Sequence, residues 1–383
     1  VKSELLHRSY LINREHYQKR VVSIKNSNYE NDISRIQSRI KSSNTIINKK
    51  EIGELRIFAI ISNLSWHFEL LPDLKECGDV ELFDYVSEGY KYDNIKKNSL
   101  SRKSMNEKIL DRFISCNKER KFDVLFMYAT GYEISPNLID EIKKISNIPC
   151  ISMCLDDKHT WKGEWLGEHY SGQINLAQKF ELNWTTSPIA RDWYSVEGGN
   201  PYYMPEGFDK KTYYKQEKVK NIPISFLGAP YGFRLTLIGE LQKYNLPVYP
   251  FGPGWENYNK SNFKTENNLK NIDIINQSQI NLSHGGIGYS KDLYIIKKRD
   301  FDIPGSGGMY VTSYNNEISE HYRIGKEIVC YTNIIDLVEV LRYYVDKPNL
   351  CSEIGNAGRE KALKSHRWLH RYKKIFSIIG LIE

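Results

Sequence analysis

The sequence has no long hydrophobic run and few cysteines. No apolar segment approaches the roughly 20 residues that a membrane-spanning helix needs, and the N-terminus lacks the apolar core of a signal peptide. Six of the 383 residues are cysteine, and only Cys150 and Cys154 lie close together, without a second pair at metal-ligand spacing. We therefore expect a cytoplasmic protein with buried, reduced thiols rather than a membrane-spanning, secreted or zinc-binding protein.

The excess of positive charge is confined to one end of the chain. The formal net charge is +7, and residues 1–50 hold 11 of the 54 Lys and Arg residues but four of the 47 acids. The remaining chain is therefore balanced, with 43 charges of each sign. An evenly charged body lacks the broad basic face that binding to a phosphate backbone requires. We expect no nucleic-acid partner, and nucleic-acid binding through residues 1–50 is kept only as an alternative.

Residues 1–50 contain no Gly or Pro, and Ile33, Ile36 and Ile40 recur at helical spacing among polar residues. The spacing predicts one or two exposed helices. Two interpretations remain open: a solvated helical extension, or a basic amphipathic surface that contacts a partner protein or the inner face of a membrane peripherally.

From Glu54 onward, short apolar runs alternate with amphipathic stretches of helical length. The first series of runs is Leu55–Ile61, Val80–Val86, Phe122–Tyr128, Ile148–Leu155 and Phe180–Thr186. The second series is Ile222–Leu227, Val248–Phe251, Gln279–Leu282, Met309–Thr312 and Ile328–Tyr331. Such alternation predicts mostly parallel sheets covered by helices, and the length favours two cores. We expect an α/β fold of two Rossmann-like domains facing a central cleft.

The predicted domain map has five parts. They are a basic helical extension (1–50), a first Rossmann-like domain (51–205), a linker (206–221), a second Rossmann-like domain (222–365) and a C-terminal helix (366–383). Ligands of such sheets bind beyond the carboxyl ends of the strands, so the residues that follow each run are the candidates for chemistry.

Glycines and cations cluster after the strands of the second series. Gly228 follows a strand and precedes a predicted helix that carries Arg234, a layout that points backbone N–H groups at a phosphate. The stretch SHGGIGYSKDLYIIKKRDFDIPGSGG (283–308) places three cations between two glycine clusters, where they would neutralise a diphosphate. The candidate donor-binding residues in this stretch are His284, Gly285, Gly286, Lys297, Arg299, Asp302, Ser306, Gly307 and Gly308.

Five segments of the second half resemble the CgeB-like, group 1 family of bacterial glycosyltransferases. They are FLGAPYGFR (226–234), FGPGW (251–255), KKRDFDIPGSGG (297–308), GKEIVCY (325–331) and the closing stretch 341–371. The resemblance implies a GT-B fold, a nucleoside diphosphate sugar as donor, no required metal or cofactor, and a C-terminal helix at His366–Phe376 that crosses back to the first domain.

The resemblance also assigns individual roles. Arg299 matches the arginine of the family's R-x-F-E pattern, which is expected near the donor diphosphate. Asp302 stands where the family has Glu, so its reach toward the sugar or ribose is shorter by about one methylene. Glu327 matches a later acidic position that binds ribose hydroxyls. The structural alternatives are a helix cap for Asp302 and a solvated strand edge for Glu327.

In the first domain, two carboxylates follow an apolar run in the segment CLDDKH (154–159). A carboxylate there would take the proton from an acceptor hydroxyl, and we predict Asp157 as this general base, with His159 and Asp156 as the next candidates. A capping acid pair is the structural alternative. Glu206, near the predicted linker, is a candidate cleft residue.

Together these patterns predict a metal-independent glycosyltransferase. It would move a sugar from a nucleoside diphosphate sugar to a hydroxyl of a surface glycan, a glycolipid or a glycoprotein, with Arg234, Lys297, Arg299 and glycine N–H groups stabilising the leaving diphosphate. The alternative from another class is a catalytically silent module that keeps the fold and binds nucleotide sugars.

Overall fold

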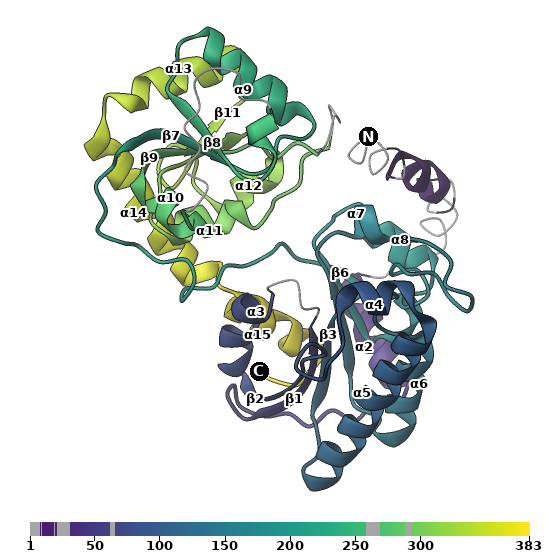
Figure 1. The fold of residues 1–383 in the computed structure, drawn as a ribbon. Coiled ribbons are helices and arrows are strands. Elements are labelled where there is room, and N and C mark those ends of the chain that lie inside the picture. Colours follow the sequence, from purple (N-terminus) through teal and green to yellow (C-terminus); the bar gives the residue numbers. More distant parts are fainter. Residues whose placement is uncertain are drawn as a thin grey trace. The chain divides into compact units, whose positions relative to one another are not determined.

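The computed structural model describes residues 8, 10–18, 20, 31–61, 66–257, 269–287 and 293–383, so parts of the predicted 1–50 extension lie outside the described residues. The chain divides into two compact units (Figure 1). The first domain comprises Ser9–Pro205 and Trp368–Glu383, and the second domain is built on Glu206–Arg367. Each is a separate α/β body.

The first domain is organised around a six-stranded parallel sheet with the order β2-β1-β3-β4-β5-β6. Its strands are β1 (Leu55–Ile61), β2 (Gly78–Phe83), β3 (Val124–Tyr128), β4 (Cys150–Cys154), β5 (Leu182–Thr185) and β6 (Pro201–Tyr203). The connecting helices are α3 (His67–Lys75), α4 (Tyr92–Lys97), α5 (Ser99–Glu119), α6 (Pro136–Ile145), α7 (Asp157–Thr160) and α8 (Ala190–Val196). Strands β3, β4 and β5 are almost wholly buried because helices cover both faces of the sheet, which explains their continuous apolar runs.

The second domain holds a five-stranded parallel sheet with the order β11-β10-β9-β7-β8. Its strands are β7 (Ile222–Leu227), β8 (Val248–Phe251), β9 (Ser278–Leu282), β10 (Tyr310–Ser313) and β11 (Val329–Tyr331). Its helices are α9 (Phe233–Lys243), α10 (Asn271–Gln277), α11 (Arg299–Gly305), α12 (Asn316–His321), α13 (Ile334–Val345) and α14 (Pro348–Ser365). The predicted α/β fold with two parallel-sheet domains is confirmed, whereas β6 was not among the predicted strands.

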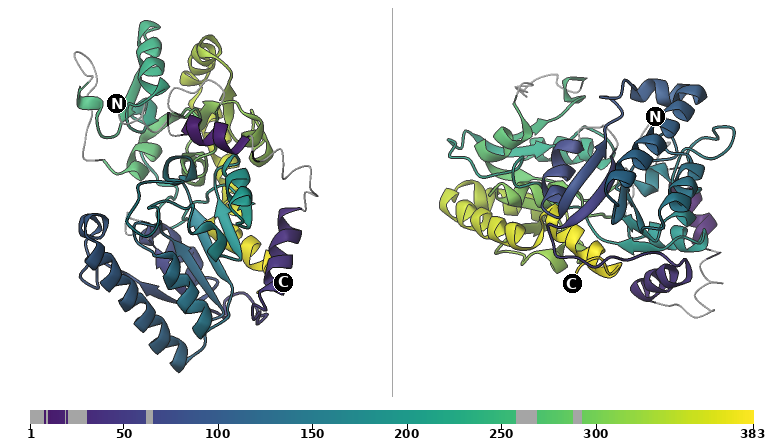
Figure 2. Two further views of the ribbon diagram at one scale, coloured as in Figure 1. Left: turned by 90° about the vertical axis from the view of Figure 1, so that its right-hand side faces the viewer. Right: turned by 90° about the horizontal axis from the view of Figure 1, so that it is seen from below.

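Helices from the two ends of the chain pack together in the first domain. Helix α2 (Asp32–Ser42) and helix α15 (Trp368–Ile378) lie side by side (Figures 1 and 2). Ile36 and Ile40 of α2 enter the same core cluster as Trp368 and Tyr372 of α15. The apolar spacing therefore predicts the helix correctly, but the stripe is buried in this core rather than exposed to solvent.

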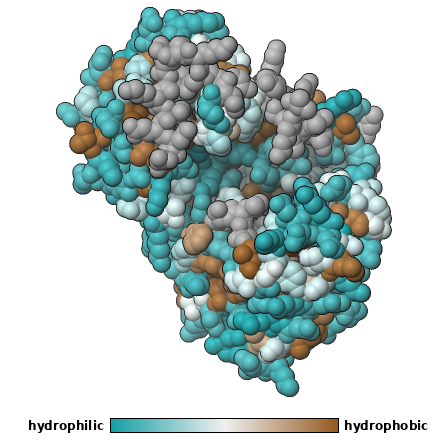
Figure 3. Space-filling view, in the orientation of Figure 1, coloured by the Kyte–Doolittle hydropathy of each residue, from teal (hydrophilic) through white to brown (hydrophobic). Residues whose placement is uncertain are grey.

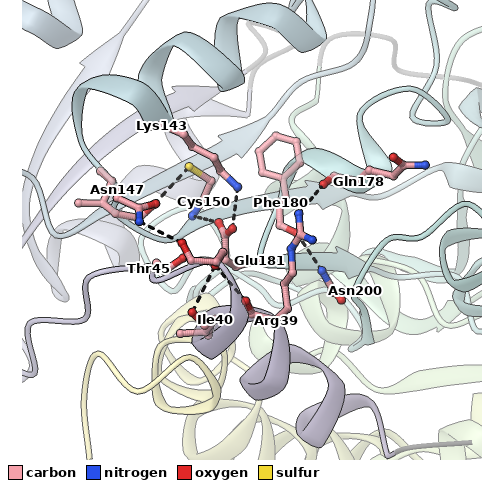
Figure 4. A network of polar contacts seen from close by, with 12 residues as sticks. Arg39, Ile40, Thr45, Lys143, Asn147, Cys150, Gln178, Phe180, Glu181 and Asn200 are labelled. Carbon is pink, nitrogen blue, oxygen red and sulfur yellow. Dashed lines mark hydrogen bonds and ion pairs between the residues drawn. The ribbon is translucent and has the colours of Figure 1, made fainter.

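The segment that follows α2 is also tied to the first domain, by the polar network of Figure 4. The backbone carbonyl of Asn147 accepts from the Ile46 N–H at 2.7 Å, and the Asn147 amide donates to the Asn44 carbonyl at 2.7 Å. Arg39 donates to the carbonyl of Gln178 at 3.3 Å. Residues 31–50 are therefore an integral layer of the first domain.

Carboxylates of the first domain neutralise some of the cations of residues 1–50. Arg20 pairs with Glu197 at 2.8 Å, and Lys50 pairs with Asp123 at 2.7 Å. This pairing leaves a smaller positive excess for a membrane or partner surface than the sequence suggests.

No helix in the described part of the chain has the length and apolar character needed to cross a membrane. On the face drawn in Figure 3, hydrophobic residues are scattered among hydrophilic ones.

Candidate functional site

The strand order of the second domain places a ligand crevice at the carboxyl ends of β7 and β9. The connections run in opposite directions from these two neighbouring strands, which is where open α/β sheets bind ligands. Gly228, directly after β7, has a φ of +138°, and Gly252, after β8, has a φ of +133°. A Cβ on Gly252 would lie 2.9 Å from the carbonyl carbon of Gly228, so the two turns touch and both require glycine.

Two arginines converge on this crevice. Arg234 lies in the first turn of α9 and Arg299 begins α11, yet a Cβ on Gly228 would lie 2.9 Å from Nη1 of Arg234 and 3.3 Å from Nη1 of Arg299. Nη1 of Arg234 contacts the Ala229 carbonyl at 3.3 Å, and Nε of Arg299 contacts Ser283 Oγ at 3.4 Å. Within the described residues, neither guanidinium forms an ion pair with a carboxylate.

The electrostatics of this pair are unfavourable without a ligand. Arg234 is only 6% exposed, and its Nε atom is buried without a hydrogen-bond partner among the described residues. Burial, together with the charge of Arg299, lowers the pKa of Arg234 to about 10, so Arg234 is still a cation at neutral pH. A buried cation beside a partly buried one, with no ion pair to a carboxylate among the described residues, forms a site for an anion.

His284 follows β9 beside the arginines and is neutral. Burial and the charge of Arg234 lower the pKa of His284 to about 4. Its Nδ1 lies 3.0 Å from the hydroxyl of Tyr331, and that hydroxyl donates its one proton to the Ser283 carbonyl at 3.1 Å. Nδ1 therefore carries the ring hydrogen, and Nε2 is left as an acceptor.

The backbone beside His284 is held close to the crevice. The N–H of Gly285 donates to Ser313 Oγ at 2.9 Å, and a Cβ on Gly286 would lie 2.4 Å from Nε2 of His284. The structure thus brings together Gly228, Arg234, His284, Gly285, Gly286 and Arg299.

Asp300 and Tyr310, which the sequence does not single out, hold Arg299 in its orientation. The Asp300 carboxylate is buried and accepts from the Lys297 backbone N–H at 2.6 Å and from the Tyr310 hydroxyl at 2.8 Å. Burial raises the pKa of Asp300. These bonds pin the first turn of α11, which orients its first residue, Arg299. The sequence carried no signal for this, because the partner Tyr310 lies in a separate strand.

The second glycine cluster lies at the other edge of the sheet. Helix α11 carries the chain from Arg299, beside the crevice, to Gly305, and Ser306, Gly307 and Gly308 then precede the amino end of β10. A Cβ on Gly355 of α14 would lie 2.4 Å from the Gly307 carbonyl oxygen, so small residues allow this close approach. The expectation of one diphosphate between two glycine clusters does not fit, because α11 separates them.

The two acids of the second domain have partners of their own. Asp302 is buried, and its Oδ2 lies 3.3 Å from Nζ of Lys298. Glu327 precedes the amino end of β11, and its carboxylate accepts from both the backbone N–H and Nε of Arg323 at 2.8 Å. The ribose or sugar contacts of Asp302 and Glu327 stay predictions, and for Glu327 the location at the opposite edge argues against the contact.

In the first domain, Asp157 is built into the core. Its side chain is 0% exposed, Oδ2 accepts from Thr185 Oγ1 at 2.6 Å, and Oδ1 accepts from the Tyr194 hydroxyl at 2.7 Å. Burial raises the pKa of Asp157 to about 6. A general base must reach the proton that it takes, so this geometry favours a structural anchor over the predicted base.

Near Asp157, Asp156 is exposed and His159 is partly exposed, whereas Lys158 is buried. The side chain of Asp156 is 56% exposed, and its Oδ1 lies 2.8 Å from Nζ of Lys158 and 3.9 Å from Nδ1 of His159. Asp156 and His159 therefore present a carboxylate and an imidazole together, just beyond the carboxyl end of β4. Glu206, the first residue of the second domain, is buried, and its role as a cleft residue stays a prediction.

Comparisons with known proteins give one family and many similar folds. Residues 228–377 match the family Glyco_trans_1_2, described as glycosyl transferase-like, which covers most of the second domain but less than half of the chain. The match supports a glycosyltransferase family and does not distinguish the CgeB-like subfamily. No curated protein sequence matches the chain.

The similar solved structures extend over both domains. A glycosyltransferase from Rickettsia africae has a TM-score of 0.55 at 11% identity, covering 85% of this chain and 98% of that one. Sucrose-phosphate synthase from Thermosynechococcus elongatus has a TM-score of 0.53 at 10% identity, with 85% and 100% covered. HepE from Anabaena, in complex with UDP and glucose, has a TM-score of 0.52 at 13% identity, with 85% and 100% covered. These likenesses show the GT-B fold.

Proposed function

We propose that this protein transfers a glycosyl group from a nucleoside diphosphate sugar to an acceptor hydroxyl. One observation carries the proposal: the guanidinium groups of Arg234 and Arg299 converge beside Gly228, at the carboxyl ends of β7 and β9, without a carboxylate partner among the described residues. A diphosphate supplies the missing negative charge, and the glycine turn lets it approach the backbone closely. The glycosyl transferase-like match over the same domain supports this choice of anion.

The chemistry follows from these charges. The bond between the anomeric carbon and the diphosphate oxygen breaks, and the charge that develops on the leaving diphosphate is stabilised by Arg234 and Arg299. The acceptor oxygen forms the new bond to the anomeric carbon and loses its proton to Asp156, with His159 beside it. Because the two arginines neutralise the leaving group, this account requires no metal.

The substrates are assigned by class. We propose UDP as the first nucleotide to test, because the similar Anabaena structures hold UDP, UDP-glucose, or UDP and glucose. The acceptor is a hydroxyl of a surface glycan, a glycolipid or a glycoprotein, modified on the cytoplasmic side of a membrane.

A titration with nucleoside diphosphate and with free nucleoside tests the donor site. Arg299→Ala should weaken binding of UDP by roughly 30-fold or more, because one charge-assisted contact is lost, while uridine binding changes by less than about threefold. Isothermal titration or thermal shift measures both constants.

Arg342→Ala is the matched control. Arg342 lies in α13 of the same domain, is exposed, and donates to the Tyr244 carbonyl at 3.4 Å, so this variant should bind UDP like the wild type. Equal losses for UDP and uridine in Arg299→Ala, or no loss for either, would contradict the diphosphate assignment.

The catalytically silent module is the second candidate function. Asp302 favours it, because the family that the sequence resembles has the longer Glu at this position, and the Asp302 carboxylate lies near Lys298. A wild-type protein that binds UDP-sugars but neither hydrolyses nor transfers them with any acceptor would decide for that alternative.

A further inference from the structure

A helix formed by residues 10–18 lies beside α7 and α8 of the first domain, and Tyr17 of this helix is buried against them (Figure 1). The ring of Tyr17 stacks on Trp193 with centroids 5.7 Å apart and meets the edge of Trp161 at 5.9 Å. Its hydroxyl accepts from Nε1 of Trp161 at 2.8 Å and donates to Glu197 at 2.9 Å. Burial raises the pKa of Tyr17, so the hydroxyl stays protonated and keeps both bonds.

The contacts continue from Tyr17 to the accessible acid. Trp161 follows the last residue of α7, and its ring lies 4.7 Å from that of Tyr194. The hydroxyl of Tyr194 donates to Asp157 Oδ1 at 2.7 Å, and Asp157 is the first residue of α7. A buried side chain therefore fixes each end of α7, and Tyr17 holds one of them.

Helix α7 depends on tertiary contacts for its stability. It spans four residues, Asp157–Thr160, which is far below the length at which a helix is stable without tertiary contacts. Asp156 precedes the helix and His159 lies within it, so the position of both depends on the anchors Asp157 and Trp161.

We propose that Tyr17 is a positioning residue for Asp156 and His159, so that the N-terminal helix is part of the acceptor-side machinery. The proposal rests on the function proposed above. It replaces the interpretation of residues 1–50 as a solvated helical extension, because removing Tyr17 takes away the hydrogen-bond acceptor of the indole of Trp161.

Tyr17→Phe tests the proposal while keeping the stacked ring. Loss of the hydroxyl should lower kcat by roughly tenfold, because a displacement of about 1 Å at the reacting groups costs up to ~100-fold, and the dissociation constant of UDP should stay within about twofold. Amide hydrogen exchange of residues 156–161 should become faster, and the indole N–H resonance of Trp161 should shift.

Tyr372→Phe is the matched control, since it also removes a buried hydroxyl from the first domain, one that donates to the Leu70 carbonyl at 3.2 Å. It should leave kcat and exchange at 156–161 unchanged. Unchanged kcat and exchange in Tyr17→Phe would overturn the positioning role, as would equal losses in both variants. A wild type without transferase activity would refute the proposed function instead, and the exchange data would still decide whether Tyr17 orders this segment.

Discussion

Asp157 in the first domain and Arg234 in the second are both buried charges beyond the carboxyl ends of parallel strands, but their surroundings differ. Both carboxylate oxygens of Asp157 accept short hydrogen bonds from hydroxyls, at 2.6 and 2.7 Å. Arg234 has one long hydrogen bond, at 3.3 Å to a carbonyl, the ring of Tyr231 at 4.1 Å, a second cation beside it, and a buried Nε without a hydrogen-bond partner among the described residues. A satisfied buried charge holds a structure together, whereas an unsatisfied one marks a place for a ligand.

The largest effect expected from this comparison concerns the rate of transfer. Asp156→Asn should lower kcat by about 100-fold or more, because the accessible carboxylate is the proposed general base. The Asn amide oxygen can still accept from the buried Lys158, so the thermal unfolding midpoint should fall less than in Asp157→Ala. Steady-state kinetics with UDP-sugar and acceptor measure the rate.

Asp157→Ala provides the contrast. It removes the carboxylate that accepts from the Thr185 and Tyr194 hydroxyls in the core and leaves Thr185 only its longer contact to the Ser187 carbonyl, so the free energy of unfolding should fall by about 2–4 kcal/mol. If Asp157→Asn abolishes turnover without loss of stability and Asp156→Asn does not, the roles of the two acids are exchanged.

The sequence predicts the fold well because the strands of a covered parallel sheet are continuous apolar runs. The predicted runs Leu55–Ile61 and Ile222–Leu227 coincide with β1 and β7 to the residue. Strand β6 (Pro201–Tyr203) was not predicted, because three residues, one of them proline, show no periodicity. The stripe of Ile36 and Ile40 predicts a helix, but α15, which covers it, lies more than 300 residues further along the chain.

The residue types of the proposed donor site could be predicted from the sequence, but its geometry could not. Glycines and cations after strands identify Gly228, Arg234 and Arg299. Sequence distance does not show that α11 turns the chain back across the domain, so Gly307 and Gly308 appear adjacent to Arg299 when they lie at the other edge of the sheet. Likewise, the sequence offers two adjacent acids, and only the structure shows that Asp157 is buried and Asp156 is exposed.

An effect of intermediate size is expected for Arg234, the buried charge of the second domain. Arg234→Met replaces a buried cation, which has no carboxylate partner among the described residues, by an apolar side chain. The unliganded protein should therefore become more stable by about 1 kcal/mol, while the stabilisation by saturating UDP is largely lost. Chemical unfolding with and without UDP measures both changes.

Arg323→Met is the control for Arg234→Met, because its guanidinium has a carboxylate partner and should give no gain in stability. Destabilisation of the unliganded protein by Arg234→Met would show that the cation is satisfied after all.

The smallest effect is expected at Glu327. The residue precedes the amino end of β11, whereas Gly228 and Arg234 follow the carboxyl end of β7, and these edges are opposite in a parallel sheet. Its carboxylate already accepts two hydrogen bonds from Arg323 at 2.8 Å. Glu327→Gln should therefore change the dissociation constant of UDP by less than about twofold and stability by less than about 1 kcal/mol. The opposite result would be a loss of affinity above tenfold for UDP that is absent for inorganic diphosphate. It would indicate that Glu327 contacts the ribose after all, and the chain around β11 would then have to be placed differently.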